Sequence, residues 1–189
     1  MESRPGSGAS LHTESDEQLM IRVQRGEAGA FEALFDRYRP RLFSFLARRC
    51  GDAATAEDLL QETWLRVVRA RVRFDPRRRF STWLFQIANN LCRDRARRRQ
   101  VEDMGAEQIR ETRFSGADRG PAPDLDLRLE MQRRVSELPD RLSEVLVLRY
   151  YHDLPEREIA AITGVPPGTV KSRLHRAVQI LREGVKHEG

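Results

Sequence analysis

Residues 154–176 read LPEREIAAITGVPPGTVKSRLHR, and this stretch contains two helical patterns separated by a tight turn. Pro155 favours a helix start, and Gly164-Val165-Pro166 favours a turn of about three residues. The second pattern continues with Val170 and Leu174 at a four-residue spacing, which is typical of a helix that buries one face. A short helix, a turn that contains glycine and a longer amphipathic helix together predict a helix-turn-helix.

The outer face of the second helix is polar and basic, and it carries Thr169, Lys171, Ser172, Arg173, His175 and Arg176. In helix-turn-helix motifs the N-terminal half of this helix enters the major groove, where Arg and Lys reach guanine edges or phosphates. Thr and Ser hydroxyls bond to phosphate oxygens. The face therefore predicts DNA binding, and the alternative is a helical hairpin whose charged face is only solvated.

The chain of 189 residues has a formal net charge of +5, and its positive charge is concentrated in one segment. Residues 69–99 contain eleven arginines and two aspartates, whereas residues 102–130 carry a net charge of −4. A clustered basic segment is the usual electrostatic footprint of a nucleic-acid partner. A solvated, arginine-rich helix face is the alternative interpretation of the same segment.

Upstream of the basic segment, apolar residues recur at three- and four-residue steps, the period of a buried helical face. Ser15 and Gln18 have the spacing of a capping box and predict a helix that ends at Gly26. Pro40 interrupts the next pattern and predicts a kink or a break between two helices. Asp52 predicts the start of a helix that runs to about residue 72, with inward residues Leu60, Trp64, Val67 and Val68.

These patterns, with further helices over about 82–98 and after residue 129, predict an all-α fold of two small domains. Pro and Gly in residues 1–14 indicate a disordered tail, and residues 15–101 form the first domain. The acidic residues 102–128 lack an apolar period and indicate a flexible linker to the helix-turn-helix domain, residues 129–189. No apolar run reaches the roughly 18 residues of a membrane helix, so we expect a cytoplasmic protein without membrane insertion.

Aromatic residues alternate with arginines and side-chain amides from residue 74 to residue 93. Aromatic faces stack on unpaired bases, arginines follow phosphates, and amides read base edges, so the combination fits opened DNA better than intact duplex. Core packing of each aromatic residue is the alternative. The candidate residues are Phe74, Arg77, Arg78, Arg79, Phe80, Trp83, Gln86, Asn89, Asn90 and Arg93.

A second candidate surface lies on the helix that begins near residue 52, where Asp58, Gln61, Glu62 and Leu65 share one face. Such a mixed acidic and apolar stripe is either solvated surface or a docking face for a basic partner helix. The sequence has no phosphate-binding loop, hydrolase elbow or Cys/His metal spacing, so we predict no enzyme, metal or cofactor. Cys50 and Cys92 are interpreted as buried reduced thiols, with a disulfide as the less favoured alternative.

Four blocks of this sequence, in their order and spacing, resemble the extracytoplasmic-function (ECF) sigma factors of bacteria. The blocks are DLLQETW at 58–64, FSTWLFQIANN at 80–90, LPEREIA at 154–160 and GTVKSR at 168–173. The resemblance implies two conserved regions, called two and four, which correspond to the two predicted domains. It also implies an alternative sigma factor, which binds core RNA polymerase and directs transcription initiation.

The resemblance assigns a role to each candidate surface. It implies that the face of Asp58, Gln61, Glu62 and Leu65 docks on the clamp helices of the polymerase β′ subunit, and that the polymerase β flap is a further contact. The segment 74–90 is implied to melt the minus-ten element and to hold a flipped base near Trp83 and Asn90. Segment 167–176, which adds Pro167 and Gly168, is implied to read the minus-thirty-five element. An anti-sigma factor is a further implied partner.

We therefore predict a factor that recognises both promoter elements and melts DNA only together with core polymerase. The alternative is a conventional two-domain regulator that binds duplex DNA through its helix-turn-helix. Such a regulator does not dock on polymerase, and it needs neither the aromatic and arginine segment nor the acidic and apolar face.

Overall fold

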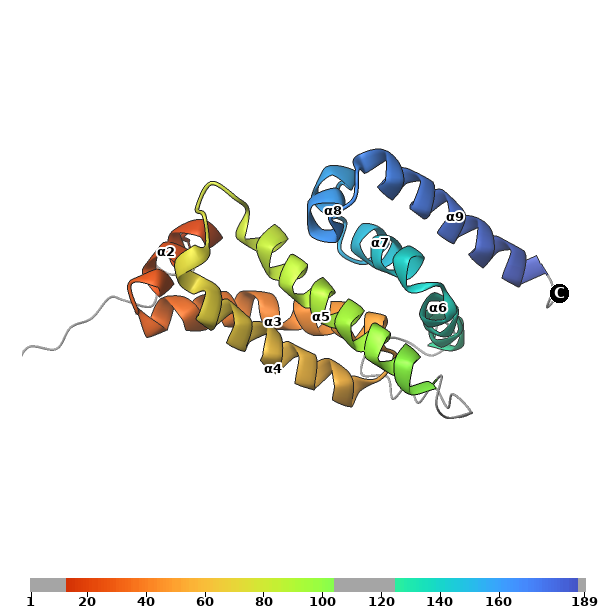
Figure 1. Cartoon of the computed structure of the whole chain (residues 1–189), viewed down its shortest axis with the longest axis horizontal. Helices are drawn as coiled ribbons and strands as arrows, with labels where there is room; N and C mark the ends of the chain where they lie inside the picture. The colour runs from red at the N-terminus through yellow and green to blue at the C-terminus, as the bar shows by residue number, and fades with distance from the viewer. Residues whose placement is uncertain (1–12, 104–124, 187–189) are drawn as a thin grey trace, which may run out of the picture.

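The computed structural model describes residues 13–103 and 125–186, and within these ranges every regular element is helical, which confirms the all-α prediction. Figure 1 shows an amino-terminal domain, α2 to α5, beside a carboxy-terminal domain, α6 to α9. The elements of the first domain are α2 (Asp16–Gln24), α3 (Ala28–Cys50), α4 (Ala53–Ala70), the 3-10 turn η1 (Arg71–Arg73) and α5 (Phe80–Asp103). Those of the second are α6 (Leu125–Glu137), α7 (Asp140–Tyr150), α8 (Glu156–Thr163) and α9 (Pro167–Lys186).

The predicted tail and linker fall largely outside the described residues, since 1–12 and 104–124 are not described. Helix α5 extends to Asp103 and helix α6 begins at Leu125, so both helices enter the range predicted as linker. Within 13–103 and 125–186, no helix has the length and apolar character needed to cross a membrane.

Residues that the sequence indicates mark ends of α2, α3 and α4, whereas α5, expected over about 82–98, runs from Phe80 to Asp103. Ser15 and Gln18 form the predicted capping box at the start of α2. The Asp52 carboxylate accepts a hydrogen bond from the Thr55 backbone N–H at 2.7 Å and so caps α4. Gly51 ends α3 with a φ of 78°, a left-handed conformation that glycine adopts without steric cost.

Helix α3 continues through Pro40, so a break between two helices at this position is wrong. Proline removes one backbone N–H and thereby deprives the carbonyl of residue 36 of its helical partner. Asp36 and Pro40 are both exposed, so water can satisfy that carbonyl. Tyr38 and Leu42 are buried in the core, and their packing helps to hold the helix on both sides of Pro40.

Helix α3 packs against α2, α4 and α5 to form the core of the first domain. Phe45 of α3 meets Phe85 of α5 edge to face, with ring centroids 5.3 Å apart. Val67 of α4 is fully buried in this core. Val68 is 37% exposed, so its predicted inward position is wrong. Successive residues are rotated by about 100° around a helix axis, which turns Val68 away from the face that Val67 occupies.

The second domain contains the predicted helix-turn-helix. Helix α8 ends at Gly164, whose φ of 70° turns the chain toward α9. The buried residues Ile159 and Ile162 of α8 belong to the core that Val170 and Leu174 of α9 complete. Helix α7 packs on both α8 and α9. The apolar spacing in the sequence therefore identified the inner face of both helices.

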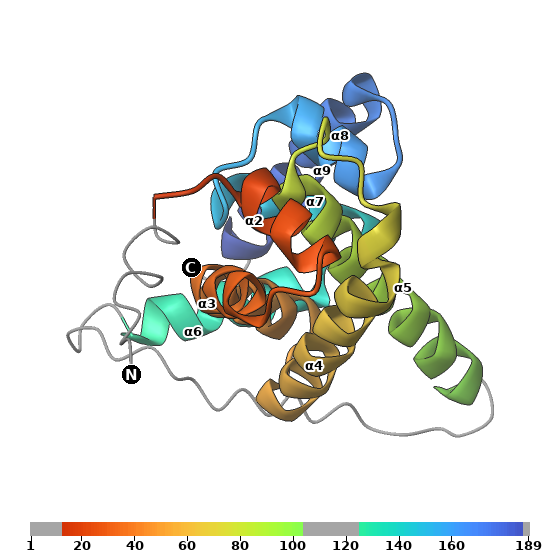
Figure 2. The same cartoon turned by 90° about the vertical axis from the view of Figure 1, so that its left-hand side faces the viewer.

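The two domains pack directly on each other. Figures 1 and 2 show α7 and α8 beside α5, and α7 also contacts α3. The His152 ring lies 5.8 Å from the Phe45 ring and 5.3 Å from the Phe85 ring, centroid to centroid. An Arg49 Nη2 atom lies 2.7 Å from Asp140 Oδ1. Apolar contacts and ion pairs thus join the domains, and this closed arrangement positions the candidate sites.

Candidate nucleic-acid interface

The basic loop between η1 and α5 is held in place by side chains of helix α2. The Gln24 amide donates hydrogen bonds to the backbone carbonyls of Arg71 and Phe74, each at 2.9 Å. The Glu17 carboxylate accepts a hydrogen bond from the Phe80 backbone N–H at 3.0 Å, which anchors the first turn of α5. These contacts fix both ends of the loop, while the arginines between them, at positions 77, 78 and 79, are exposed.

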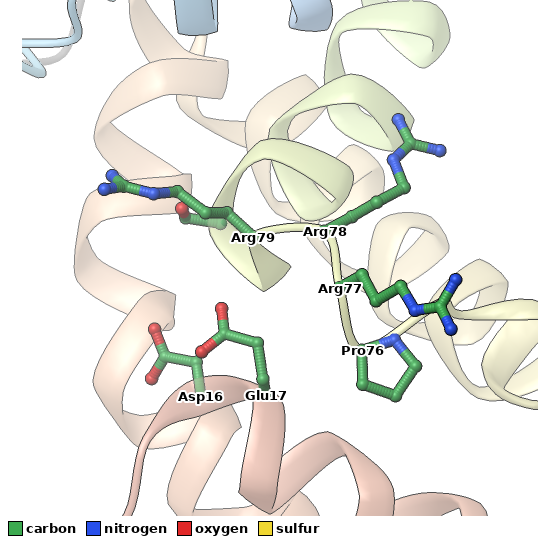
Figure 3. A pocket seen from close by; sticks show the side chains of 7 residues that line it. Asp16, Glu17, Pro76, Arg77, Arg78 and Arg79 are labelled. Carbon is green, nitrogen blue, oxygen red and sulfur yellow. The ribbon is translucent and has the colours of Figure 1, made fainter.

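An open pocket of about 520 Å³ lies between this loop and the start of α2, and the three loop arginines line one side. Figure 3 shows the carboxylates of Asp16 and Glu17 on the side opposite these arginines. The Asp16 carboxylate is already bound by Arg37 and by the Tyr38 hydroxyl. The arginines thus lie on the loop side of the pocket, where they can bind phosphates. On the acidic side, Asp16 already has partners within the domain.

The predicted base-stacking residues differ in their accessibility. Phe74 and Phe80 are buried, and their ring centroids lie 6.0 Å apart. Trp83 is half-buried and packs against both, with its ring centroid 5.1 Å from Phe74 and 6.1 Å from Phe80. Of these three rings, only that of Trp83 is partly accessible, and the two phenylalanine rings pack against it.

Further along α5, the predicted DNA-reading residues point in different directions. Asn90 is exposed, and Gln86 is half-buried with its amide oxygen 3.5 Å from Arg78 Nη2. Asn89 is fully buried. Its Nδ2 donates a hydrogen bond to Glu144 Oε2 of α7 at 3.2 Å. Arg93 lies one turn beyond Asn89 and contacts the same carboxylate, so part of this face is covered by the second domain.

Glu144 is the centre of a charged cluster that joins the domains. Its side chain is fully buried, and Arg93 Nε and Nη2 donate to its two oxygens at 2.8 and 2.9 Å. Arg173 Nη1 of α9 donates to Oε1 at 2.9 Å. The hydrogen bond to Glu144 raises the pKa of Arg93 above its ordinary value. Three predicted DNA-contacting residues thus share one carboxylate, and this paired geometry stabilises a charge that burial would otherwise penalise.

A second ion pair joins the basic loop to the helix-turn-helix. Arg79 Nη1 lies 2.6 Å from Glu158 Oε1 of α8, and 72% of the Arg79 side chain is exposed. An exposed pair of this kind contributes at most about 1 kcal/mol. It nevertheless places the loop beside α8.

The outer face of α9 is exposed at every predicted position except Thr169 and Arg173. Pro167, Gly168, Lys171, Ser172, His175 and Arg176 are exposed. Thr169 is half-buried, and its backbone carbonyl accepts a hydrogen bond from the Ser172 hydroxyl at 3.0 Å. Arg173 points inward to Glu144. In the closed arrangement the exposed residues can reach DNA, whereas Arg173 is occupied.

The candidate docking face on α4 is exposed and partly apolar. Asp58 and Gln61 are exposed, and Glu62 forms a salt bridge of 2.9 Å with Arg66 on the same helix. Leu65 and Val68 of α4 are 50% and 37% exposed, and Val72 in the following turn η1 is 69% exposed. The sequence identified Leu65 but assigned Val68 to the core and did not single out Val72. We call residues 58, 61, 62, 65, 68 and 72 the α4 surface.

Both domains match known protein families. The chain matches the family Sigma-70 region 2 over residues 34–102 and the family Sigma-70, region 4 over residues 128–181. These matches define a transcription initiation factor of the sigma-70 class, which is not an enzyme.

Two relatives show to which group of this class the chain belongs. The ECF RNA polymerase sigma factor SigW of Bacillus subtilis is 34% identical over 175 residues, covering 87% of this chain and 93% of that protein. The RNA polymerase sigma factor CarQ of Myxococcus xanthus is 39% identical over 165 residues, covering 87% of this chain and 94% of that protein. The chain therefore belongs to the ECF sigma factors, which direct RNA polymerase to promoters.

Two solved structures resemble the chain across both domains. CnrH, solved with the cytosolic domain of CnrY, has a TM-score of 0.72 and 24% sequence identity over 93% of this chain and 100% of that chain. The sigma factor RpoE of Bartonella quintana, solved with the anti-sigma factor NepR, has a TM-score of 0.71 and 25% identity. That match covers 82% of this chain and 96% of RpoE. The two-domain fold is thus shared with known sigma factors.

Proposed function

We propose that this sigma factor divides its work among three surfaces on three different helices. The α4 surface binds core RNA polymerase, the segment from the basic loop into α5 opens the minus-ten element, and the outer face of α9 reads the minus-thirty-five element. The observation that carries this proposal is the separation of three chemically distinct exposed surfaces: acidic and apolar on α4, aromatic and basic at the start of α5, and basic with hydroxyls on α9.

The α4 surface has the composition of a docking site for a basic helix. Leu65 and Val68 are exposed apolar residues on the helix that carries the carboxylates of Asp58 and Glu62, and the exposed Val72 follows in η1. Burial of such side chains contributes roughly 25 cal/mol per Å² removed from water, and the carboxylates orient a positively charged partner. The proposed partner of this surface is the pair of clamp helices of the β′ subunit.

The start of α5 combines the groups that an opened strand requires. Trp83 supplies a stacking surface, and stacking on an aromatic ring is worth about 1–3 kcal/mol per base. The exposed loop arginines at 77, 78 and 79 supply sequence-independent attraction to phosphates. Asn90 is exposed on the next turns of the helix and can bond to a base edge. Phe74 and Phe80 act here as support for the tryptophan ring.

The closed arrangement sets a condition on this function. Asn89, Arg93 and Arg173 cannot contact DNA while all three are bound to Glu144. The domains must therefore separate before the full DNA-reading surface is available. Polymerase docking through the exposed α4 surface, and through a β-flap contact of the second domain, supplies the binding energy for that separation.

An anti-sigma factor is the second proposed partner. RpoE of Bartonella quintana, which shares the fold and 25% of aligned residues, was solved in complex with the anti-sigma factor NepR. We extend that kind of partner to this chain, together with a cytoplasmic location beside core polymerase. An anti-sigma factor that binds the closed arrangement keeps the DNA-reading residues on Glu144.

Run-off transcription with purified core polymerase tests the proposed function. The chain should direct a defined transcript from its own promoter, and core polymerase alone should give none. A conventional duplex-binding regulator would add no transcript, and that outcome would refute the proposal.

Permanganate reactivity of the minus-ten thymines separates melting from promoter binding. Trp83→Ala should slow strand opening about tenfold or more, since it removes one stacking platform. Trp83→Phe keeps an aromatic ring and should retain most of the activity. Normal permanganate reactivity in Trp83→Ala would contradict the assigned role of this residue.

A further inference from the structure

The two cysteines of the sequence lie side by side, although they are far apart in the chain. Cys50 is the last residue of α3, and Cys92 belongs to α5. Their Sγ atoms are 4.0 Å apart, and both are free thiols. Neither cysteine belongs to the polymerase-binding or DNA-reading surfaces, so the proposed function leaves this pair without a role.

The two thiols have different environments. Cys92 is buried with 4% of its surface exposed, whereas Cys50 is half-buried. A hydrogen bond from Cys92 lowers the pKa of the Cys50 thiol, and the positive charges of Arg49 and Arg95 act in the same direction. The same hydrogen bond and burial raise the pKa of Cys92. Because the thiolate is the reactive form, Cys50 is the more nucleophilic and more accessible member.

We propose that Cys50 and Cys92 are a modification site that hydrogen peroxide oxidises to a reversible intramolecular disulfide. The Cys50 thiolate attacks the peroxide, the O–O bond breaks, and hydroxide leaves as water after taking up a proton. The sulfur of Cys92 then attacks the resulting Cys50 sulfenic acid, the S–O bond breaks, and the thiol proton leaves with hydroxide as a second water. Two thiols are oxidised, and one hydrogen peroxide is reduced to two waters.

The local geometry permits this bond. A disulfide needs the two sulfurs about 2.05 Å apart, so they must approach by about 2 Å from the observed separation. Cys50 lies at the end of its helix and is followed by Gly51, whose positive φ of 78° already turns the chain away from α3. Helix ends fray more easily than helix interiors, so Cys50 can move toward the more rigid Cys92.

The disulfide also acts on the domain interface, and this part of the inference depends on the proposed function. Each cysteine is next to an arginine that contacts the second domain. Cys50 follows Arg49, which binds Asp140, and Cys92 precedes Arg93, which binds Glu144. A bond between the cysteines fixes these two arginine-bearing segments relative to each other. The oxidised chain should therefore open more slowly than the reduced chain when core polymerase is added.

Thiol counting on the full-length chain tests the modification site directly. After treatment with hydrogen peroxide, the wild-type chain should lose both maleimide-reactive thiols and the mass of two hydrogens, and it should remain monomeric on a non-reducing gel. Dithiothreitol should restore both thiols. Persistence of both thiols, or formation of intermolecular dimers alone, would overturn the proposal.

Two matched variants identify the order of reaction. Cys92→Ser should stop at a Cys50 sulfenic acid that dimedone traps, whereas Cys50→Ser should react at least about tenfold more slowly because Cys92 is buried. Circular dichroism checks that both variants fold. If Cys50→Ser does not fold, Cys50→Ala replaces it. Equal rates for Cys50→Ser and the wild type would contradict the assignment of Cys50 as the nucleophile.

Run-off transcription with oxidised and reduced chain tests the link to domain opening. The oxidised wild type should show a loss of initial rate that dithiothreitol reverses, and the Cys50→Ser/Cys92→Ser double variant should show no response. An unchanged rate with the disulfide present would overturn this link. If the reduced wild type gives no transcript, the proposed function fails, and the thiol count still decides the modification site by itself.

Discussion

The α4 surface and the α5 face differ in what the closed arrangement does to them. On the α4 surface, Leu65 of α4 and Val72 of the following turn η1 are exposed to solvent at 50% and 69%. On α5, Asn89 is fully buried and Arg93 is bound to Glu144 of the second domain. The proposed polymerase-binding surface is therefore accessible in the isolated chain, whereas part of the proposed DNA-reading surface is not. This difference indicates an order of events in which polymerase docks before the promoter is opened.

The largest expected effect comes from Glu144→Ala, which removes the carboxylate that covers the α5 face. Arg93 and Arg173 then lie close together without their shared partner, and loss of one partner from a buried ion pair costs about 3–5 kcal/mol. The domains should separate, which small-angle scattering detects as a larger radius of gyration. Glu158→Ala, which breaks the exposed pair with Arg79, is the control and should cost at most about 1 kcal/mol.

Leu65→Glu should affect the α4 surface, the other surface in this comparison. The substitution adds a charge to the apolar part of the α4 surface and should weaken core polymerase binding by on the order of 2 kcal/mol, or about thirtyfold. The fold should be unchanged because Leu65 is half exposed. Surface plasmon resonance with immobilised core polymerase measures the affinity, and Glu32→Gln on α3 is the control. An unchanged affinity would remove α4 from the proposed docking site.

The helices that were predicted from the sequence are those whose positions depend on local pattern. Apolar spacing and cap residues gave the helices, since Ser15 and Asp52 act through neighbours three residues away. Local pattern failed at Pro40, where the exposed side of α3 tolerates the lost hydrogen bond. It also failed at Val68, because one step around the helix separates a buried residue from an exposed one.

The candidate site was predicted in part, and its missing pieces are long-range. Glu144 directly precedes the apolar run 145–148 of α7, and a carboxylate at this position is the signal that sequence reasoning overlooked. Its partners Asn89 and Arg173 are 55 and 29 residues away in the chain, so no spacing rule connects them. The 4.0 Å approach of Cys50 to Cys92 across 42 residues has the same origin. Packing of α5 against α7 and α8 brings Asn89 to Glu144, and packing of α3 against α5 brings Cys50 to Cys92.

Acid should loosen the closed arrangement through His152. Burial, reinforced by Arg41 and Arg48, lowers the pKa of this side chain to about 4. An exposed imidazole has a pKa near 6.5, so the opened chain binds the proton first as the pH falls. The stabilisation is complete above about pH 6.5 and is lost toward pH 4, with about 2 kcal/mol lost by pH 5.

Scattering at pH 7 and pH 5 measures this change in the closed arrangement. The wild type should expand at the lower pH, whereas His152→Phe should not respond to pH in this range. Equal expansion of both proteins would show that another group is responsible. The α4 surface contains no histidine, so polymerase docking provides a comparison at the same two pH values.

The smallest effect is expected at Arg176, which the closed arrangement leaves exposed on α9. Arg176→Ala should weaken binding to a minus-thirty-five duplex by about 1 kcal/mol and lower the slope of affinity against salt by about one charge. Fluorescence anisotropy over a salt series gives both values, and the exposed Arg182, farther along the helix, provides the control substitution. Loss of polymerase affinity in a pull-down would contradict a role confined to DNA.

Energy transfer between Asn90 on α5 and Lys171 on α9 tests the central claim most directly. Dyes are attached through Asn90→Cys and Lys171→Cys in a chain that also carries Cys50→Ser and Cys92→Ser. The free chain should show high transfer efficiency, and core polymerase without any DNA should lower it. An efficiency that stays high until promoter DNA is added, or that is already low in the free chain, would contradict the account.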